Sequence, residues 1–137
     1  MTDLERLRTG PFHDLVGYEF IEAGPEGVVI ALDIEDKHLS QNGVLHGGVA
    51  LTILDTVGGM SFVCHRDDVV TVATINISVN FLRMVAAGRL FARAKVDFAG
   101  SRVGYVSMTL SEGGLDGPEI CRAHGSWRLF DRPVEKP

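Results

Sequence analysis

The sequence predicts an α+β fold in which a curved antiparallel sheet of about six strands wraps around one long central helix. One long apolar run, residues 46–64, predicts the helix, because its length and its Gly, Ala and Leu content suit about five turns. Shorter segments before and after this run have the composition and spacing of strands. A helix that is apolar on nearly every side is expected to be buried all round, and a sheet of this size can bury it.

The expected elements follow in chain order. Leu4 and Leu7 stand at helical spacing and predict a short N-terminal helix within a helical segment, residues 1–12, which ends near Gly10-Pro11. A turn at residues 24–27 separates the first two strands. After the helix, residues 70–82 alternate most regularly between apolar and polar side chains, and residues 131–137 form a tail. The strands are expected over residues 17–23, 27–34, 70–82, 89–98, 103–110 and 119–130.

Length and charge restrict the class of protein. The 137 residues suit one domain over residues 1–137, and the net charge of −5 argues against a general nucleic-acid binder, whose binding face would be basic. Two cysteines are too few for a disulfide framework, so we expect reduced thiols and a cytoplasmic protein. The charged N-terminus lacks the apolar segment of a secretory signal, and we expect a buried helix, not a membrane span, at the long apolar run.

Asp55 is the first candidate functional residue. It is the only Asp, Glu, Lys or Arg between Lys37 and Arg66, and it stands inside the long apolar run. An ionised carboxylate in such a helix is unfavourable unless it is paired or used in chemistry. A carboxylate facing solvent is the simpler alternative, but the helix has no polar face to which it could belong. The position therefore favours a functional carboxylate.

Small residues surround Asp55 at helical spacing, namely Gly48, Thr52, Gly58 and Gly59. Glycine destabilises a helix by about 1 kcal/mol relative to alanine, so several on one face indicate that something approaches the backbone closely. A ligand, another subunit or tight packing against the sheet would each satisfy this pattern.

The segment before the helix, residues 41–48, is the second candidate. Free N–H groups at a helix N-terminus and the positive end of the helix dipole can stabilise an oxyanion or a polarised carbonyl. Gly47 and Gly48 carry no side chain that would block the approach of a ligand.

Other kinds of site lack their sequence patterns. The chain has no Gly-x-Ser-x-Gly elbow, no Walker-type phosphate loop and no Gly-x-Gly-x-x-Gly fingerprint. Its five histidines form no His-x-x-x-His pair and no Cys-x-x-Cys motif accompanies them, so we expect no metal site. Cys64 and Cys121 are expected to pack as small apolar residues.

His46-Gly47-Gly48, with Asp55 nine residues after the histidine, resembles the hotdog-fold acyl-CoA thioesterases, specifically the PaaI-like group. Asn42 before the motif, a third-strand signature at residues 77–83 and a hairpin at residues 100–102 extend the resemblance over most of the chain. The resemblance implies a hotdog fold and hydrolysis of an acyl-CoA, with coenzyme A as part of the substrate and no other cofactor.

The resemblance also implies roles for individual residues. Asp55 corresponds to the nucleophile or general base, and the Gly47 N–H to the donor that polarises the thioester carbonyl. His46 and Asn42 correspond to supporting polar residues, although Gln41 beside Asn42 could fill the second position. Thr74 corresponds to a residue that positions the attacking water.

Substrate binding is expected at Gly48, Arg83 and Arg102. The two arginines are candidates for the CoA phosphates, and ordinary solvated arginines at strand ends are the alternative. The acyl group is expected to be aromatic, such as phenylacetyl or hydroxybenzoyl, or a medium-length chain. Five phenylalanines could line its pocket or belong to the core: Phe12, Phe62, Phe81, Phe91 and Phe98.

Helix geometry indicates a shared active site. Asp55 lies about 13 Å along the helix from His46, so one carboxylate cannot attack a carbonyl that is bound beside that histidine in the same chain. Two antiparallel copies of the helix could bring both groups together. The resemblance implies the same arrangement, a homodimer with two composite sites that usually pairs further into a homotetramer.

Two other functions compete with hydrolysis. Some hotdog proteins hydrate or dehydrate acyl thioesters, but with a different arrangement of histidine and carboxylate. A hotdog dimer could also bind acyl-CoA in a regulatory role without turnover, and the intact Asp55 argues against that function.

Overall fold

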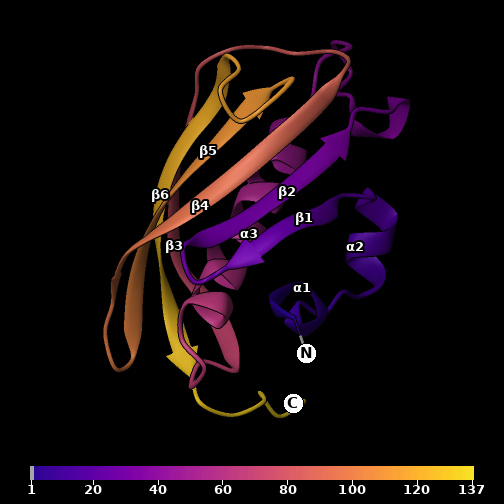
Figure 1. The fold of residues 1–137 in the computed structure, drawn as a ribbon. Coiled ribbons are helices and arrows are strands. Elements are labelled where there is room, and N and C mark those ends of the chain that lie inside the picture. The colour runs from indigo at the N-terminus through magenta and orange to yellow at the C-terminus, as the bar shows by residue number, and fades with distance from the viewer. Residues whose placement is uncertain (1) are drawn as a thin grey trace.

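The computed structural model describes residues 2–137, so Met1, the first residue of the expected N-terminal helical segment, lies outside it. An antiparallel sheet of six strands, in the order β1-β2-β4-β5-β6-β3, curves around the long helix α3 (Figure 1). The helices are α1 (Asp3–Arg6), α2 (Pro11–Val16), the short 3-10 helix η1 (Asp36–His38) and α3 (Gly47–His65). The strands are β1 (Glu19–Gly24), β2 (Gly27–Asp33), β3 (Thr71–Phe81), β4 (Arg89–Ala99), β5 (Val103–Glu112) and β6 (Glu119–Phe130). The predicted α+β hotdog architecture is confirmed.

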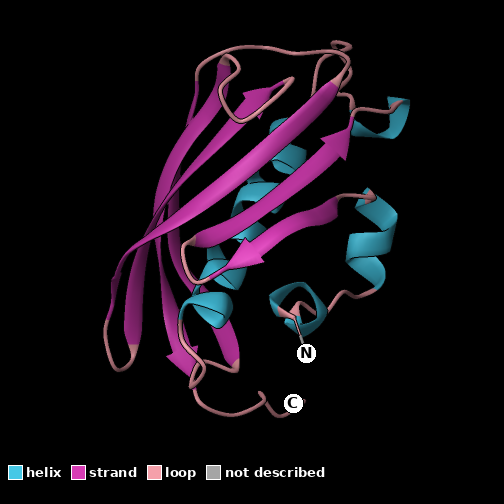
Figure 2. Cartoon of the chain, viewed as in Figure 1, coloured by secondary structure: helices cyan, strands magenta, loops and turns pink. Residues whose placement is uncertain are grey.

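The core lies between α3 and the concave face of the sheet (Figure 2). Leu54, Val57 and Phe62 are fully buried there, with the Trp127 ring of β6 against Phe62. By length and composition alone, α3 could cross a membrane. In this fold its apolar side chains pack against the strands instead, which accounts for its hydrophobicity.

One face of α3 remains uncovered, so the expectation of a helix buried all round is wrong in this chain. Gly48, Leu51, Thr52 and Asp55 are exposed or half-buried, and their spacing of three and four residues places them in one stripe. Leu51, an apolar residue, is 38% exposed in this stripe. Asp55 therefore lies on an open face of the central helix.

Strand β3 forms one edge of the sheet and contains a bulge at Ile75. Thr74 pairs with Trp127 and Asn76 with Ser126, which leaves Ile75 unpaired and 57% exposed. The extra residue reverses which side chains face the helix. Val72 and Thr74 face it before the bulge, and Ile77 faces it afterwards. The regular alternation expected over residues 70–82 is therefore broken at Ile75.

The N-terminal segment differs from the expected single short helix. Only one turn, α1, forms in the first residues, and a second helix begins at Pro11, where the sequence pattern placed a stop. Proline suits the first turn of a helix, since its missing N–H would have no partner there. Gly17 ends α2 in a left-handed conformation with φ 85°. Both short helices lie on the β1 side of the molecule (Figure 1).

Candidate active site

Asp55 is held by the neighbouring strand and not by its own helix. The Thr74 hydroxyl of β3 donates a hydrogen bond of 2.5 Å to Asp55 Oδ1. Within residues 2–137, no cation forms an ion pair with this carboxylate and Oδ2 has no hydrogen-bond partner. Asp55 thus has one fixed oxygen and one available oxygen on the open face of α3, as a general base or nucleophile requires.

The other hydroxyls on this face bond back to the helix. Thr52 Oγ1 donates to the Gly48 carbonyl at 2.8 Å, and Thr56 Oγ1 donates to the Thr52 carbonyl at 2.9 Å. Such bonds satisfy the hydroxyls locally. Thr74 is accordingly the side chain that positions Asp55, and the structure places this predicted residue beside the predicted carboxylate.

The helix start offers one free donor. His46 is the N-cap, and its Nδ1 accepts a hydrogen bond of 2.8 Å from the Gly48 N–H. This bond assigns the ring proton of a neutral His46 to Nε2. The Gly48 N–H is therefore occupied, whereas the Gly47 N–H, at the first helical position, has no partner among the described residues. Of the two predicted glycines, Gly47 is the one that can polarise a carbonyl.

His38, which no sequence motif indicates, holds the helix start in place. This buried ring accepts from the Glu35 N–H at Nδ1, 2.9 Å, and its Nε2 lies 2.6 Å from the Val16 carbonyl. The His38 carbonyl accepts from the His46 N–H at 2.8 Å. Its burial follows from tertiary contacts with α2, which no local pattern indicated.

Gln41 and Asn42 lie in an exposed turn before the helix. Gly43, in a left-handed conformation with φ 74°, closes this turn with a bond from its N–H to the Ser40 carbonyl. The Asn42 N–H bonds to Ser40 Oγ at 3.3 Å. The geometry leaves the choice between Asn42 and Gln41 as the supporting residue open.

Gly58 and Gly59 do not make room for a ligand or a partner subunit, contrary to one interpretation of their pattern. A Cβ at Gly58 would lie 2.6 Å from Trp127 and 2.7 Å from the Met108 sulfur, and one at Gly59 would lie 3.0 Å from Val72. These glycines let the indole of Trp127 approach the helix backbone. The alternative of tight packing against the sheet is the correct one for both.

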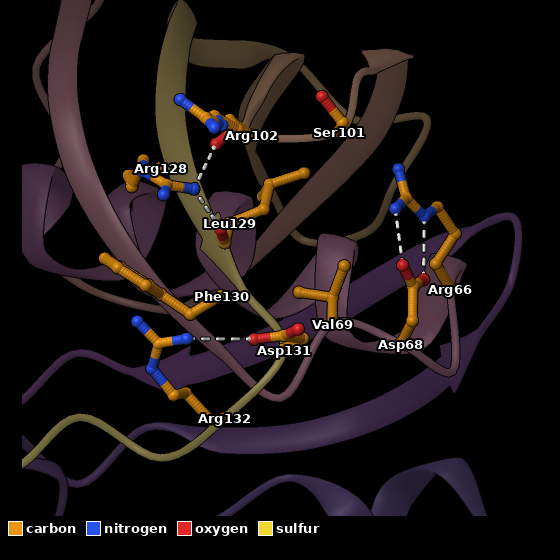
Figure 3. Close-up of a pocket in the computed structure, with 10 residues that line it drawn as sticks. All are labelled: Arg66, Asp68, Val69, Ser101, Arg102, Arg128, Leu129, Phe130, Asp131 and Arg132. Atoms are coloured by element: carbon orange, nitrogen blue, oxygen red, sulfur yellow. Dashed lines mark hydrogen bonds and ion pairs between the residues drawn. The ribbon is translucent and has the colours of Figure 1, made fainter.

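The predicted phosphate-binding arginines lie in different surroundings. Arg83 forms an ion pair with Glu112, with 3.9 Å between Nη2 of the guanidinium group and Oε2 of the carboxylate. Arg102 lines a cavity of about 390 Å³ beyond the C-terminal end of α3, together with Arg66, Arg128 and Arg132 (Figure 3). Asp68 and Asp131 are the two acidic residues of this cavity, so its charged side chains have a positive excess.

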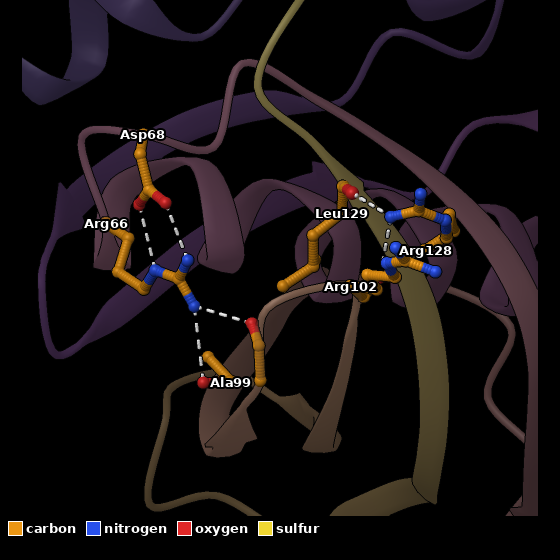
Figure 4. A network of polar contacts seen from close by, with 7 residues as sticks. Arg66, Asp68, Ala99, Arg102, Arg128 and Leu129 are labelled. Atoms are coloured by element: carbon orange, nitrogen blue, oxygen red, sulfur yellow. Dashed lines mark hydrogen bonds and ion pairs between the residues drawn. The ribbon is translucent and has the colours of Figure 1, made fainter.

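Within the cavity, the charges are unequally neutralised (Figure 4). Arg66 binds both carboxylate oxygens of Asp68 and donates to the carbonyls of Ala99 and Gly100. The hydrogen bonds from Arg66 lower the pKa of Asp68. Arg128 donates to the Arg102 carbonyl, and neither arginine pairs with a carboxylate among the described residues. These two guanidinium groups can therefore bind an added anion.

No group of three or more His, Cys, Asp or Glu side chains in residues 2–137 is arranged to hold a metal ion.

Asp55 and Gly47 are separated by eight residues, or about 12 Å along α3. The structure of one chain therefore does not bring the predicted carboxylate and the predicted donor together.

Known proteins are similar to this chain both in amino-acid sequence and in fold. A family model described as "Thioesterase superfamily" matches residues 42–116. A protein of Halobacterium salinarum named "Putative esterase VNG_1336C" is 33% identical over 100 residues, covering 69% of this chain and 66% of that protein. "Putative esterase Rv1847" of Mycobacterium tuberculosis is 29% identical over 97 residues, which is 69% of either chain.

Solved structures match over most of the chain. The esterase structure from Mycobacterium tuberculosis superposes with a TM-score of 0.83 at 23% identity, over 91% of this chain and 100% of that one. A thioesterase of Haemophilus influenzae gives a TM-score of 0.81 at 20% identity, over 89% of this chain and 84% of that one. The matched family model covers more than half of the residues, and these structures share the fold. The chain belongs to the thioesterase superfamily and has its hotdog fold.

Proposed function

We propose that this protein is an acyl-CoA thioesterase of the PaaI-like group that hydrolyses its substrate to a free acid and coenzyme A. The observation that carries the proposal is the Asp55 carboxylate, which is bonded by Thr74, unpaired with any cation in residues 2–137 and open to one face of α3. The thioesterase family of the chain supports the same reaction.

In the proposed reaction, the Gly47 N–H donates to the thioester oxygen and stabilises the negative charge that develops on it. The positive end of the α3 dipole adds to this stabilisation. Asp55 either attacks the carbonyl carbon or removes a proton from the attacking water. Either attack breaks the carbon–sulfur bond, and the thiolate of coenzyme A takes a proton. Where water attacks, its oxygen becomes part of the acid; where Asp55 attacks, a water molecule then hydrolyses the acyl–Asp55 anhydride, which frees the acid and restores the carboxylate.

We propose that each active site combines Asp55 of one chain with Gly47 of a partner chain. In one chain these residues are about 12 Å apart, whereas a thioester needs both groups within contact distance of a single carbonyl. Strand β3 is an edge whose outer side is unpaired in this chain, and a two-fold axis beside it would extend the sheet and make the two α3 helices antiparallel. The exposed Leu51 and Ile75 would be covered in such a dimer.

We further propose that two such dimers associate into a homotetramer and that the protein acts in the cytoplasm, as the family resemblance implies. The acyl group would be aromatic, such as phenylacetyl or hydroxybenzoyl, or a medium-length chain. His46 and Asn42 would support the bound carbonyl.

The CoA phosphates are proposed to bind in the cavity of Arg102 and Arg128. Ala73, next to Thr74, pairs with Arg128 across the sheet, which places the cavity close to the strand that holds Asp55. Arg66 follows Asp55 by about 16 Å along α3, a distance comparable to an extended phosphopantetheine arm. A Streptococcus pneumoniae thioesterase protein of the same fold was solved with coenzyme A, with a TM-score of 0.74 at 18% identity over 82% of this chain and 85% of that one. Arg83 is the weaker candidate, because Glu112 already neutralises it.

The test is thiol release from a panel of aromatic and aliphatic acyl-CoAs by wild type and Asp55→Asn. We expect release by wild type and a loss of about 10²- to 10⁴-fold in kcat in the variant, which is the range that a positioned base contributes. Asp116→Asn, at an exposed turn, is the matched control and should retain full activity. Full activity of Asp55→Asn would overturn the mechanism.

Wild type that binds CoA esters without releasing thiol would support a binding protein. An absorbance change with an enoyl thioester and no free thiol would support a hydratase or dehydratase.

A further inference from the structure

The last residue of β3, Phe81, lies against the start of α3. Its ring carbons Cε1 and Cζ are 3.4 and 3.5 Å from the position that a Cβ on Gly47 would occupy. Gly47 is also the residue whose N–H is free. An apolar ring and an unpaired donor, separated by more than thirty positions in the sequence, are therefore neighbours.

The bulge at Ile75 determines the direction of this ring. After the bulge, Ile77 and Val79 pack against the core, so Phe81, two residues further, points to the same side of β3. Unlike those two residues, Phe81 is 57% exposed. Its ring therefore extends past the end of the core and covers the helix start only in part.

Phe62 and Phe98 have aromatic neighbours, although Phe98 is as exposed as Phe81. Phe62 is fully buried against Trp127, and Phe98 has Tyr105 as an aromatic neighbour, with 6.2 Å between ring centroids. Phe81 has neither a closed environment nor an aromatic neighbour among the described residues. Small-molecule sites combine apolar side chains with a few placed polar groups, and Phe81 and the Gly47 N–H supply one of each.

We propose that Phe81 is the acyl-binding residue, and that its ring selects aromatic acyl groups. This inference rests on the proposed function. A carbonyl oxygen that accepts from the Gly47 N–H would lie about 2.9 Å from the nitrogen, and a substituent as large as a phenyl group can extend from that carbonyl towards the neighbouring ring. An aryl group stacks on the Phe81 ring and gains both apolar contact and ring–ring attraction, whereas a methyl group gains little of either.

The test measures binding, so it does not depend on turnover. Phenacyl-CoA and acetonyl-CoA are thioether ketones that keep a carbonyl, resist hydrolysis and differ only in a phenyl or methyl substituent. Their dissociation constants are measured by calorimetry for wild type, Phe81→Ala, Phe81→Leu and the control Phe98→Ala. We expect wild type and Phe98→Ala to bind phenacyl-CoA about tenfold more tightly than acetonyl-CoA.

In Phe81→Ala the two constants should fall within about twofold of each other, and Phe81→Leu should retain only part of the preference. If Phe81→Ala does not fold, Phe81→Leu decides by the same ratio. An unchanged preference in the Phe81 variants, an equal weakening of both ligands, or no binding of either ligand to wild type would overturn the inference. Wild type that shows the expected preference but hydrolyses no thioester would contradict the proposed function alone.

Discussion

Thr74 of β3 holds Asp55 of α3 through a hydrogen bond of 2.5 Å, which joins the only charged residue of the helix before its last turn to the edge strand of the sheet. The bulge at Ile75 follows Thr74 directly, so Thr74 before it and Ile77 after it face the helix on the same side of the strand. An edge strand therefore both orients the carboxylate and offers the surface on which a second chain can pair.

Removing the hydroxyl of Thr74 should impair turnover and not substrate binding. We expect Thr74→Val to lower kcat by about 10- to 100-fold and to leave KM within about twofold. The reason is that the Thr74 hydroxyl acts on the Asp55 carboxylate and not on the bound substrate. Thr74→Ser keeps the donor and should restore most of the rate. Steady-state kinetics on one acyl-CoA check this, and equal losses in the valine and serine variants would argue for a packing role.

The basic cavity should affect KM through the phosphates of coenzyme A. Arg102→Ala combined with Arg128→Ala should raise KM for an acyl-CoA by about tenfold and leave KM for the corresponding acyl-pantetheine unchanged, because only the former carries the phosphates. Arg93→Ala, on β4 outside this cavity, is the matched control. A similar rise in KM for both substrates would place the phosphates elsewhere.

Gly58 is required by packing. The Cβ of an alanine there would lie 2.6 Å from the Trp127 ring and 2.7 Å from the Met108 sulfur, so the core must shift to accept it. We expect Gly58→Ala to lower the free energy of unfolding by about 1–3 kcal/mol, despite the better helix propensity of alanine. Chemical denaturation measures the difference. Gly114→Ala, where a Cβ meets nothing within 4 Å, should change stability by less than about 0.5 kcal/mol.

The two cysteines should be unreactive in the folded protein. Burial raises the pKa of Cys64 and of Cys121 to about 11, so at pH 8 about one thiol in a thousand is ionised. A thiol reagent should modify both residues rapidly in guanidinium chloride and slowly in buffer. Because the pKa of each folded thiol is raised above its ordinary value of 9.0, this contribution to stability is complete below pH 9 and is lost as the pH rises towards 11. Rapid modification of the native protein at pH 8 would contradict the burial of these thiols.

Asp55 could be singled out from the sequence because a lone charge in a long apolar run is visible without any tertiary information. The resemblance to the family indicated Thr74 as a residue that positions water, and the structure places its hydroxyl against Asp55. The regular alternation expected over residues 70–82 did not include the bulge at Ile75. A bulge depends on how two strands pair, so the alternation of one strand cannot reveal it.

The different roles of the glycines on α3 cannot be predicted from the local sequence, because they depend on side chains of distant strands. Gly47 and Gly58 are the same residue type on the same helix, yet one leaves a donor open and the other accommodates the indole of Trp127 from a distant strand. The cavity around Arg102 was likewise not visible, since its arginines come from the C-cap of α3, the β4–β5 hairpin, β6 and the C-terminal tail. The start of α2 at Pro11 does not follow from the sequence pattern, because Gly-Pro is found both after the end of a helix and at the start of one.

Mixing two inactive variants shows whether each active site is shared between two chains. Asp55→Asn removes the carboxylate. Gly47→Pro removes the donor N–H at the first helical position, where proline is tolerated, and His46 before it already has the extended conformation that proline requires, with φ −65° and ψ 131°. Each variant alone should be inactive, and both should keep the circular dichroism spectrum of wild type.

After the two variants are unfolded together and refolded at equal concentrations, half of the dimers should contain one chain of each kind. In these dimers one of the two sites combines an intact Asp55 with an intact Gly47, so the mixture should recover about a quarter of the wild-type activity. A mixture that forms mixed dimers and stays inactive would contradict the shared site.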